Sequence, residues 1–107
     1  MSTLQYDQIK DELLETFPIA PGELYPLYSD EMANKEKITV AYQALKRSIR
    51  SKDRKMALIS AYFIGRILAE TKNTTEEYRL KSLLTRHYVA LAEKTYLLFK
   101  ANPPQIF

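Results

Sequence analysis

The stretch that decides the fold runs from Met56 to Ala69 and reads MALISAYFIGRILA. Apolar residues occupy almost every position, so that a helix built from this stretch would have no polar face. A helix that is apolar all round is normally buried among other helices. The stretch is too short and too polar to cross a bilayer. We therefore expect a central helix over 53–72, in which Gly65 would allow a neighbouring helix to approach closely.

The residues before this stretch predict the first arm of a helical hairpin. One helical face is apolar over 35–50, where it carries Ile38, Ala41, Tyr42, Leu45 and Ile49. This spacing predicts a helix with Asn34 as its cap. Only the three residues Ser51, Lys52 and Asp53 separate it from the central helix. Because so short a break leaves little room to turn, the two helices should be antiparallel.

The first third of the chain predicts an acidic helix and then a connector. The spacing of Ile9, Leu13 and Phe17 indicates one buried face of a helix over 4–17. Pro18 should end that helix, since proline cannot continue the hydrogen-bond ladder. Residues 18–34 form a Pro-containing connector that we expect to pack, and 22–33 could hold a short extra helix.

The last third predicts one long helix over 74–100. Thr74 and Glu77 have the spacing of a capping box at its start. Two offset apolar stripes follow: Leu80, Leu84, His87, Leu91 and Leu98 form the first, and Val89, Ala92, Tyr96 and Phe99 form the second. We interpret one stripe as packed inside and the other as free to meet a partner or a second copy of the chain.

Together these segments predict an all-α, antiparallel four-helix bundle in a single domain over 1–107, with a fifth short helix in the 22–33 connector as an open alternative. The expected parts are the acidic first helix (1–17), the connector (18–34), a basic three-helix portion (35–100) and a tail (101–107). The two glycines argue against a β-rich fold. The absence of cysteine excludes disulfides and thiol catalysis. With neither a signal peptide nor a membrane span, we expect a cytoplasmic protein, or one inside a host cell if it is viral.

Charge is distributed unevenly along the chain. Residues 1–34 hold seven acidic residues against one lysine, a net of −6, whereas residues 35–107 hold fifteen cations against six acidic residues, a net of +9. Two interpretations follow: the acidic third folds over part of the basic remainder, or the basic remainder faces an acidic partner.

The strongest candidate site is a basic cluster at the junction of the two hairpin helices. It consists of Lys46, Arg47, Arg50, Lys52, Arg54 and Lys55. Cations at the end of the first helix are favoured by the helix dipole, whereas cations at the start of the next are not. The cluster is therefore either a solvated helix junction or a surface for a phosphate or an acidic protein.

The tyrosines provide the second candidate. Eight occur in 107 residues, and Tyr25 and Tyr28 in the connector are the ones we expect to be partly exposed. We find no catalytic constellation, cofactor motif or metal-ligand spacing around the single histidine, His87. The sequence thus predicts a non-enzymatic protein-interaction module. A nucleic-acid-binding regulator that contacts the phosphate backbone is the alternative, and an enzyme without a familiar motif is a third.

Overall fold

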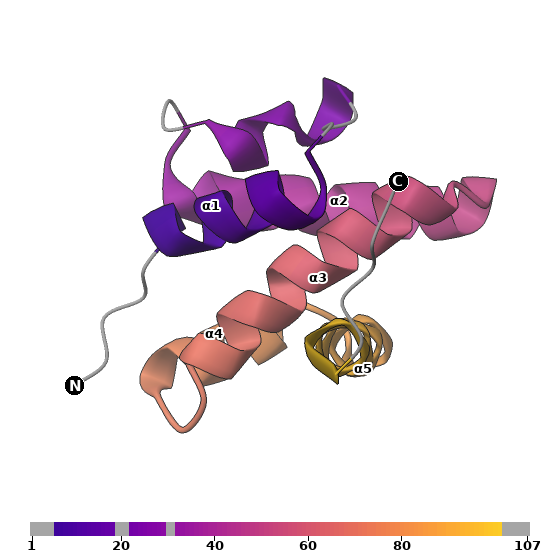
Figure 1. Cartoon of the computed structure of the whole chain (residues 1–107). Coiled ribbons are helices and arrows are strands. Elements are labelled where there is room, and N and C mark those ends of the chain that lie inside the picture. The colour runs from indigo at the N-terminus through magenta and orange to yellow at the C-terminus, as the bar shows by residue number, and fades with distance from the viewer. Residues whose placement is uncertain (1–5, 19–21, 30–31, 102–107) are drawn as a thin grey trace.

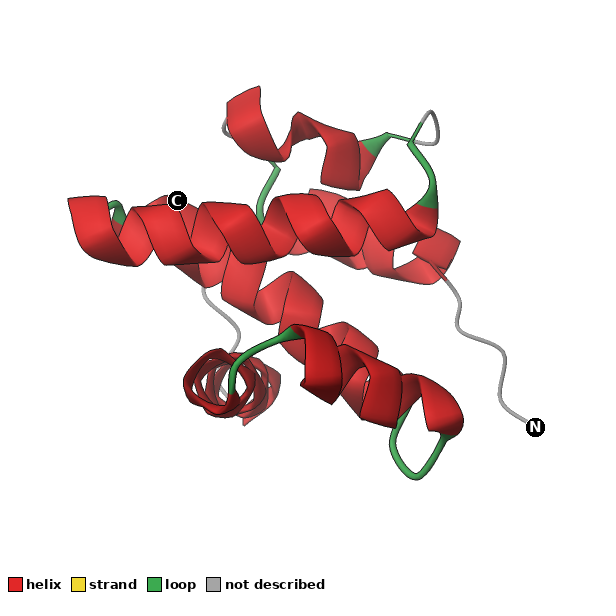
Figure 2. Cartoon of the chain, turned by 180° about the vertical axis from the view of Figure 1, so that it is seen from behind, coloured by secondary structure: helices red, strands yellow, loops and turns green. Residues whose placement is uncertain are grey.

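The computed structural model describes residues 6–18, 22–29 and 32–101, which form six helices and no strand (Figures 1 and 2). The helices are α1 (Tyr6–Thr16), the 3₁₀-helix η1 (Gly22–Tyr28), α2 (Asn34–Ser51), α3 (Arg54–Glu70), α4 (Thr75–Leu83) and α5 (Arg86–Ala101). The all-α class is confirmed. The alignment of four antiparallel helices is not, because α5 is seen nearly end-on where α2 lies in the plane of the view.

Helix α3 is the centre of the fold. All ten residues from Ile59 to Leu68 are buried. Figure 1 shows α3 running from α1 and α2 towards α4 and α5, and its largest packing surfaces are with α2 and α5. The central position predicted from the apolar stretch is therefore confirmed.

Helices α3 and α5 cross in direct backbone contact at Gly65. A Cβ atom at this position would lie 2.3 Å from the carbonyl oxygen of Ala92 and 2.6 Å from Cβ of Tyr96. Both distances fall well inside the roughly 3.5–4.0 Å at which non-bonded atoms pack. Gly65 thus permits the close approach that the sequence predicted, and no larger residue fits without displacing α5.

The α2–α3 hairpin is closed by two residues, Lys52 and Asp53. Lys52 adopts a left-handed conformation with φ of 62°, and its N–H donates to the carbonyl of Ile49 at 3.4 Å. The N–H of Asp53 donates to the carbonyl of Ser48 at 2.8 Å, which completes a Schellman motif. The Asp53 carboxylate then accepts from the N–H of Met56 at 3.2 Å and caps α3. The predicted short break between the two helices is thereby confirmed.

The start of α2 differs from the prediction. Asn34 is the first residue of the helix and not its cap. The cap position is Ala33, which has an extended backbone and no side chain that could cap, and its carbonyl accepts from the N–H groups of Glu36 and Lys37. The prediction of an Asn34 cap is therefore wrong: the chain enters the helix one residue earlier.

The connector packs, and its helix is shorter than predicted. It is a 3₁₀-helix that ends at Tyr28, with Pro26 inside it and with Leu24 and Leu27 buried. Proline lacks the N–H that an α-helix would need at that position. Residues 1–5, 19–21, 30–31 and 102–107 lie outside the described part of the chain, so the start of the helix expected over 4–17, part of the connector and the tail are not addressed.

The predicted single helix over 74–100 is wrong, because two helices meet at an extended residue, Leu84 (φ −94°, ψ 148°). The break accounts for most of the two offset stripes. From the first stripe, Leu80 on α4 and Leu84 at the end of α4 are buried. From the second stripe, Val89 and Ala92 on α5 are buried. A straight helix could not turn both stripes inward, and the break reorients the second one. The cap at the start of α4 is confirmed, since Thr74 Oγ1 accepts from the N–H of Glu77 at 3.3 Å.

Candidate functional site

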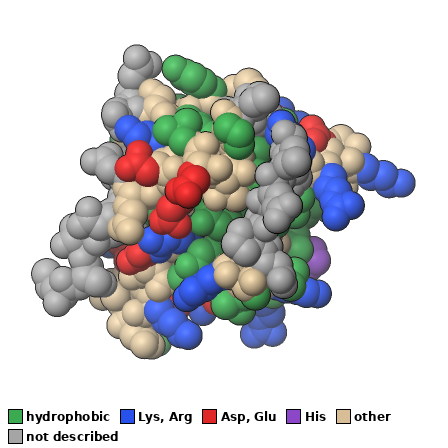
Figure 3. All heavy atoms as spheres, viewed as in Figure 1, with side chains coloured by type: hydrophobic (Ala, Val, Ile, Leu, Met, Phe, Trp, Pro, Cys, Tyr) green, Lys and Arg blue, Asp and Glu red, His purple; other side chains and the backbone are tan. Residues whose placement is uncertain are grey.

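The basic cluster lies at the end of the hairpin where α2 meets α3. Figure 3 shows Lys and Arg side chains gathered there, on the right of the molecule. Four of the six predicted cations form what we call the basic tip: Arg50, Lys52, Arg54 and Lys55. The first three are exposed and Lys55 is half-buried. None of the four forms an ion pair with any other described residue.

The other two predicted cations interact within the molecule. The Lys46 ammonium lies 4.6 Å from the centre of the Tyr42 ring, a cation–π arrangement. Arg47 Nη2 lies 2.5 Å from Glu23 Oε1 in η1, although most of the Arg47 side chain is solvent-exposed. Such an exposed pair contributes little to stability, and it leaves Arg47 accessible.

The tyrosines of the connector do not join the basic tip. Tyr25 is 62% exposed and lines a shallow pocket of about 210 Å³ beside Glu36, in the first turn of α2. Along α2, Glu36 lies roughly 20 Å from Arg50, given a rise of about 1.5 Å per residue. Tyr28 has a structural role: its hydroxyl donates to the carbonyl of Phe17 at 2.9 Å. Burial raises the pKa of Tyr28 to about 12.

The acidic third of the chain does fold over part of the basic remainder. Glu12 on α1 pairs with Arg66 on α3, and Glu23 on η1 pairs with Arg47 on α2. Within the described residues, these two contacts leave the basic tip uncovered. The acidic third therefore accounts for Arg47 and Arg66, whereas the cations of the basic tip stay available to an acidic partner.

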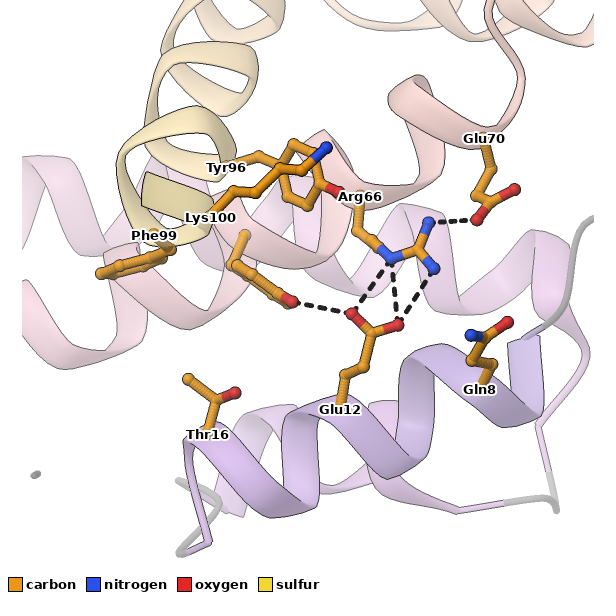
Figure 4. Close-up of a pocket in the computed structure, with 9 residues that line it drawn as sticks. Gln8, Glu12, Thr16, Arg66, Glu70, Tyr96, Phe99 and Lys100 are labelled. Atoms are coloured by element: carbon orange, nitrogen blue, oxygen red, sulfur yellow. Dashed lines mark hydrogen bonds and ion pairs between the residues drawn. The ribbon is translucent and has the colours of Figure 1, made fainter. Parts of the chain in front are cut away.

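A partly buried ion cluster around Arg66 was not predicted (Figure 4). Arg66 Nε donates to both carboxylate oxygens of Glu12, at 3.1 and 3.0 Å, and Nη2 lies 3.0 Å from Glu12 Oε2. Nη1 donates to Glu70 one turn further along α3. The Tyr62 hydroxyl donates to Glu12 Oε1 at 3.0 Å. One signal pointed to such a cluster: Arg66 is the one cation within the apolar stretch from Met56 to Ala69, and a buried arginine needs a carboxylate.

The electrostatics of the cluster favour a structural role. Burial alone would lower the pKa of Arg66, but hydrogen bonds to Glu12 and Glu70 raise it overall, so the guanidinium stays charged. Burial also raises the pKa of Tyr62, and the neighbouring charge of Glu12 adds to this effect. An open pocket of about 490 Å³ lies here between α1, α3 and α5. Its size suits a small molecule, yet its central guanidinium and carboxylates are engaged with one another.

In the rest of the described chain, we find no group of side chains arranged as a catalytic or metal site. His87 is exposed, and the contact of its ring is with Tyr88, at 5.1 Å between centroids. Among the described residues, no group of three His, Asp or Glu side chains is placed to hold a metal ion. In the same residues, no helix has the length and apolar character required to span a membrane.

The chain matches no protein-family model, no curated protein and no solved structure. The basic tip is the candidate site that the structure leaves accessible, whereas the Arg66 cluster joins α1 to α3.

Proposed function

We propose that this protein is a non-enzymatic interaction module that binds an acidic surface of a protein partner through the basic tip. The observation that carries the proposal is the contrast in pairing among the cations of the hairpin. Arg47 has a carboxylate partner, whereas Arg50, Lys52, Arg54 and Lys55 have none among the described residues. These four cations, which no carboxylate neutralises, lie between the last turn of α2 and the first turn of α3. They would attract a negatively charged surface of a partner.

The backbone that carries these cations has a fixed geometry at the turn. The Schellman bonds of Lys52 and Asp53 and the cap of α3 hold the backbone at the tip. A surface that is ordered before binding loses less conformational entropy when it binds. The basic tip is thus better suited to docking than a flexible basic tail of equal charge.

The two cations that open α3 also support an interaction role. Arg54 and Lys55 lie in the first turn of α3, where the helix dipole disfavours positive charge. An acidic residue would stabilise that position better, so the cations are not explained by the stability of α3. A partner carboxylate near this turn would interact with both the cations and the helix dipole.

Binding to nucleic acid is the alternative function for the same residues. Exposed lysines and arginines suit phosphate groups, and Arg50, Lys52 and Arg54 could contact neighbouring phosphates. The helix that follows the turn is buried from Ile59 to Leu68, so that it has no free face to place in a major groove. Such binding would contact the backbone without reading the bases.

Fluorescence anisotropy with three labelled probes tests the proposal: a Glu/Asp-rich peptide, a mixed-sequence DNA duplex and a single-stranded RNA, matched in charge. We expect the peptide to bind at least as tightly as the nucleic acids, with an affinity that falls between about 50 and 300 mM salt. The variant Arg50→Glu/Lys52→Glu/Arg54→Glu should lose this binding. The matched control is Lys72→Glu/Arg79→Glu/Lys94→Glu, which reverses three exposed cations outside the basic tip and should bind almost as the unmodified protein does.

Three results would count against the proposal. Clearly tighter binding of a nucleic acid would favour the alternative function. Equal losses in the two triple variants would show that net charge, and not the basic tip, determines binding. The absence of binding at low salt would leave the tip as a solvated helix junction.

A further inference from the structure

Two helix ends in this protein carry the same residue spacing with opposite charges. Each has a charged residue, then an aliphatic residue three positions later, then a second charged residue next to it. The α1 patch consists of Asp11, Leu14 and Glu15, and the α2 patch consists of Lys46, Ile49 and Arg50. In both, the aliphatic residue lies two positions before the last residue of its helix.

Both patches are accessible. Leu14 is 46% exposed and Ile49 is 39% exposed. The acidic residues of the α1 patch are exposed, as is Arg50, while Lys46 is half-buried over Tyr42. Neither Asp11 nor Glu15 forms an ion pair with a described residue. One exposed aliphatic side chain is ordinary on a protein surface, so the informative feature is the match between the two patches.

We infer that a second copy of this chain binds here, with the α1 patch of one copy packed antiparallel against the α2 patch of the other. On a helix, the residues at i−3 and i+1 lie on the same flank of residue i. Equivalent flanks of two facing helices meet when the helices are antiparallel. The chain therefore has its charges on the sides where an antiparallel pair would bring them together.

The register of this contact follows from helix geometry. With Leu14 opposite the second copy's Ile49, Asp11 comes opposite the second copy's Arg50, and Glu15 comes opposite the second copy's Lys46. The rise of about 1.5 Å per residue offsets each charged pair by only about 3 Å along the axis, within reach of these side chains. Both ion pairs then lie beside the contact between Leu14 and the second copy's Ile49. If the helices were shifted along one another, the opposite charges would no longer meet.

The inference rests on the proposed function and names one partner for part of the same surface. The contact is heterologous, because different patches meet. After one such contact, one copy still has a free α2 patch and the other a free α1 patch, so the assembly either closes on itself or extends. The remaining cations of the basic tip, Lys52, Arg54 and Lys55, lie outside the contact and stay available to another acidic partner.

Sedimentation velocity of the full chain tests this inference. At about 50 mM salt we expect an average mass above that of the monomer, which decreases towards the monomer at about 500 mM as the ion pairs are screened. Asp11→Lys/Glu15→Lys and Lys46→Glu/Arg50→Glu should each raise the dissociation constant at least about tenfold, through loss and reversal of two ion pairs. An equimolar mixture of the two variants should associate again, because opposite patches face one another once more.

The control Lys52→Glu/Arg54→Glu reverses two cations outside the register and should self-associate nearly as the unmodified protein does. The same variant should lose the acidic peptide, so that failure of self-association and failure of the proposed function give different results. If a reversed variant unfolds by circular dichroism, the neutral variant Asp11→Asn/Glu15→Gln provides the test and should weaken association. A monomeric protein at about 0.5 mM and low salt, or a mixture of folded variants that stays monomeric, would overturn the inference.

Discussion

Two parts of helix α3 use the same chemical group in opposite ways. One turn before its end, Arg66 is 10% exposed and bound by Glu12 and Glu70. At its start, Arg54 is exposed and has no carboxylate partner among the described residues. The sequence gives both simply as cations in one helix. The comparison shows that a cation contributes to stability where other elements fold against it and is free for binding where they do not.

The largest expected effect is the loss of the Arg66 guanidinium. Arg66→Met should lower the free energy of unfolding by about 3 kcal/mol, because two partly buried carboxylates lose their counter-charge. We expect the lower end of the usual range, since the Glu12 and Glu70 side chains are 30% and 27% exposed and can be hydrated. Urea unfolding followed by circular dichroism measures the change.

The matched control is Arg50→Met on the exposed tip, which should change stability by less than about 0.5 kcal/mol. A companion variant, Glu12→Gln/Arg66→Met/Glu70→Gln, should recover part of the lost stability because it removes the unpaired charges. Equal effects of Arg66→Met and Arg50→Met would contradict the distinction between the two parts of α3.

The second prediction concerns alkaline pH. Burial raises the pKa of Tyr62 above its ordinary value of 10.0, and so Tyr62 loses its proton near pH 10 in the unfolded chain but only at higher pH in the folded one. Unfolding therefore releases a proton above pH 10, and stability falls as the pH rises through this range. Tyr62→Phe should cost about 1 kcal/mol at neutral pH, through loss of the hydrogen bond to Glu12. Between about pH 9 and 11 it should then lose less stability than the unmodified protein.

Urea midpoints of the two proteins at several pH values measure this difference. Parallel pH profiles for the two proteins would show that the Tyr62 hydroxyl is not held in the Arg66 cluster as described.

The smallest effect, and the only gain, is expected at the tip. Lys52 has a left-handed backbone with φ of 62°, which glycine adopts without steric cost. Lys52→Gly should raise stability by about 0.5–1 kcal/mol, after allowance for the greater freedom of glycine in the unfolded chain. Thermal unfolding would show this as a higher Tm. Lys52→Ala keeps the Cβ atom and should give no such gain, so similar melting temperatures of the two variants would argue against the turn geometry.

Local sequence was sufficient for the features whose cause is local. The apolar run around Phe63 predicted a buried helix, and the short break at Lys52 and Asp53 predicted the hairpin. The cations of the basic tip were predicted as one cluster because they lie within a few residues of one another in the sequence. Tyr25 was predicted to be partly exposed and is 62% exposed, but nothing local could show that it lies far from the tip.

The remaining features depend on packing between distant segments. Glu12 and Arg66 are 54 residues apart, so their pairing follows from how α1 docks on α3 and not from any spacing. The break at Leu84 contains neither glycine nor proline. Its one signal was the pair of offset apolar stripes, which we interpreted as a core face and a partner face. A change of stripe within one predicted helix is better taken as evidence of a change in direction.

The separation of Glu12 from Arg66 also orders events while the chain is being made. The α2–α3 hairpin closes through neighbouring residues, whereas α1 has to wait for a segment synthesised 54 residues later. At about 5–20 residues per second, the ribosome takes roughly 3 to 11 s to supply it. During that interval the buried face of α1, with Ile9, Leu13 and Phe17, has no α3 to cover it. The acidic flank of α1 would then keep the nascent segment soluble until Arg66 arrives.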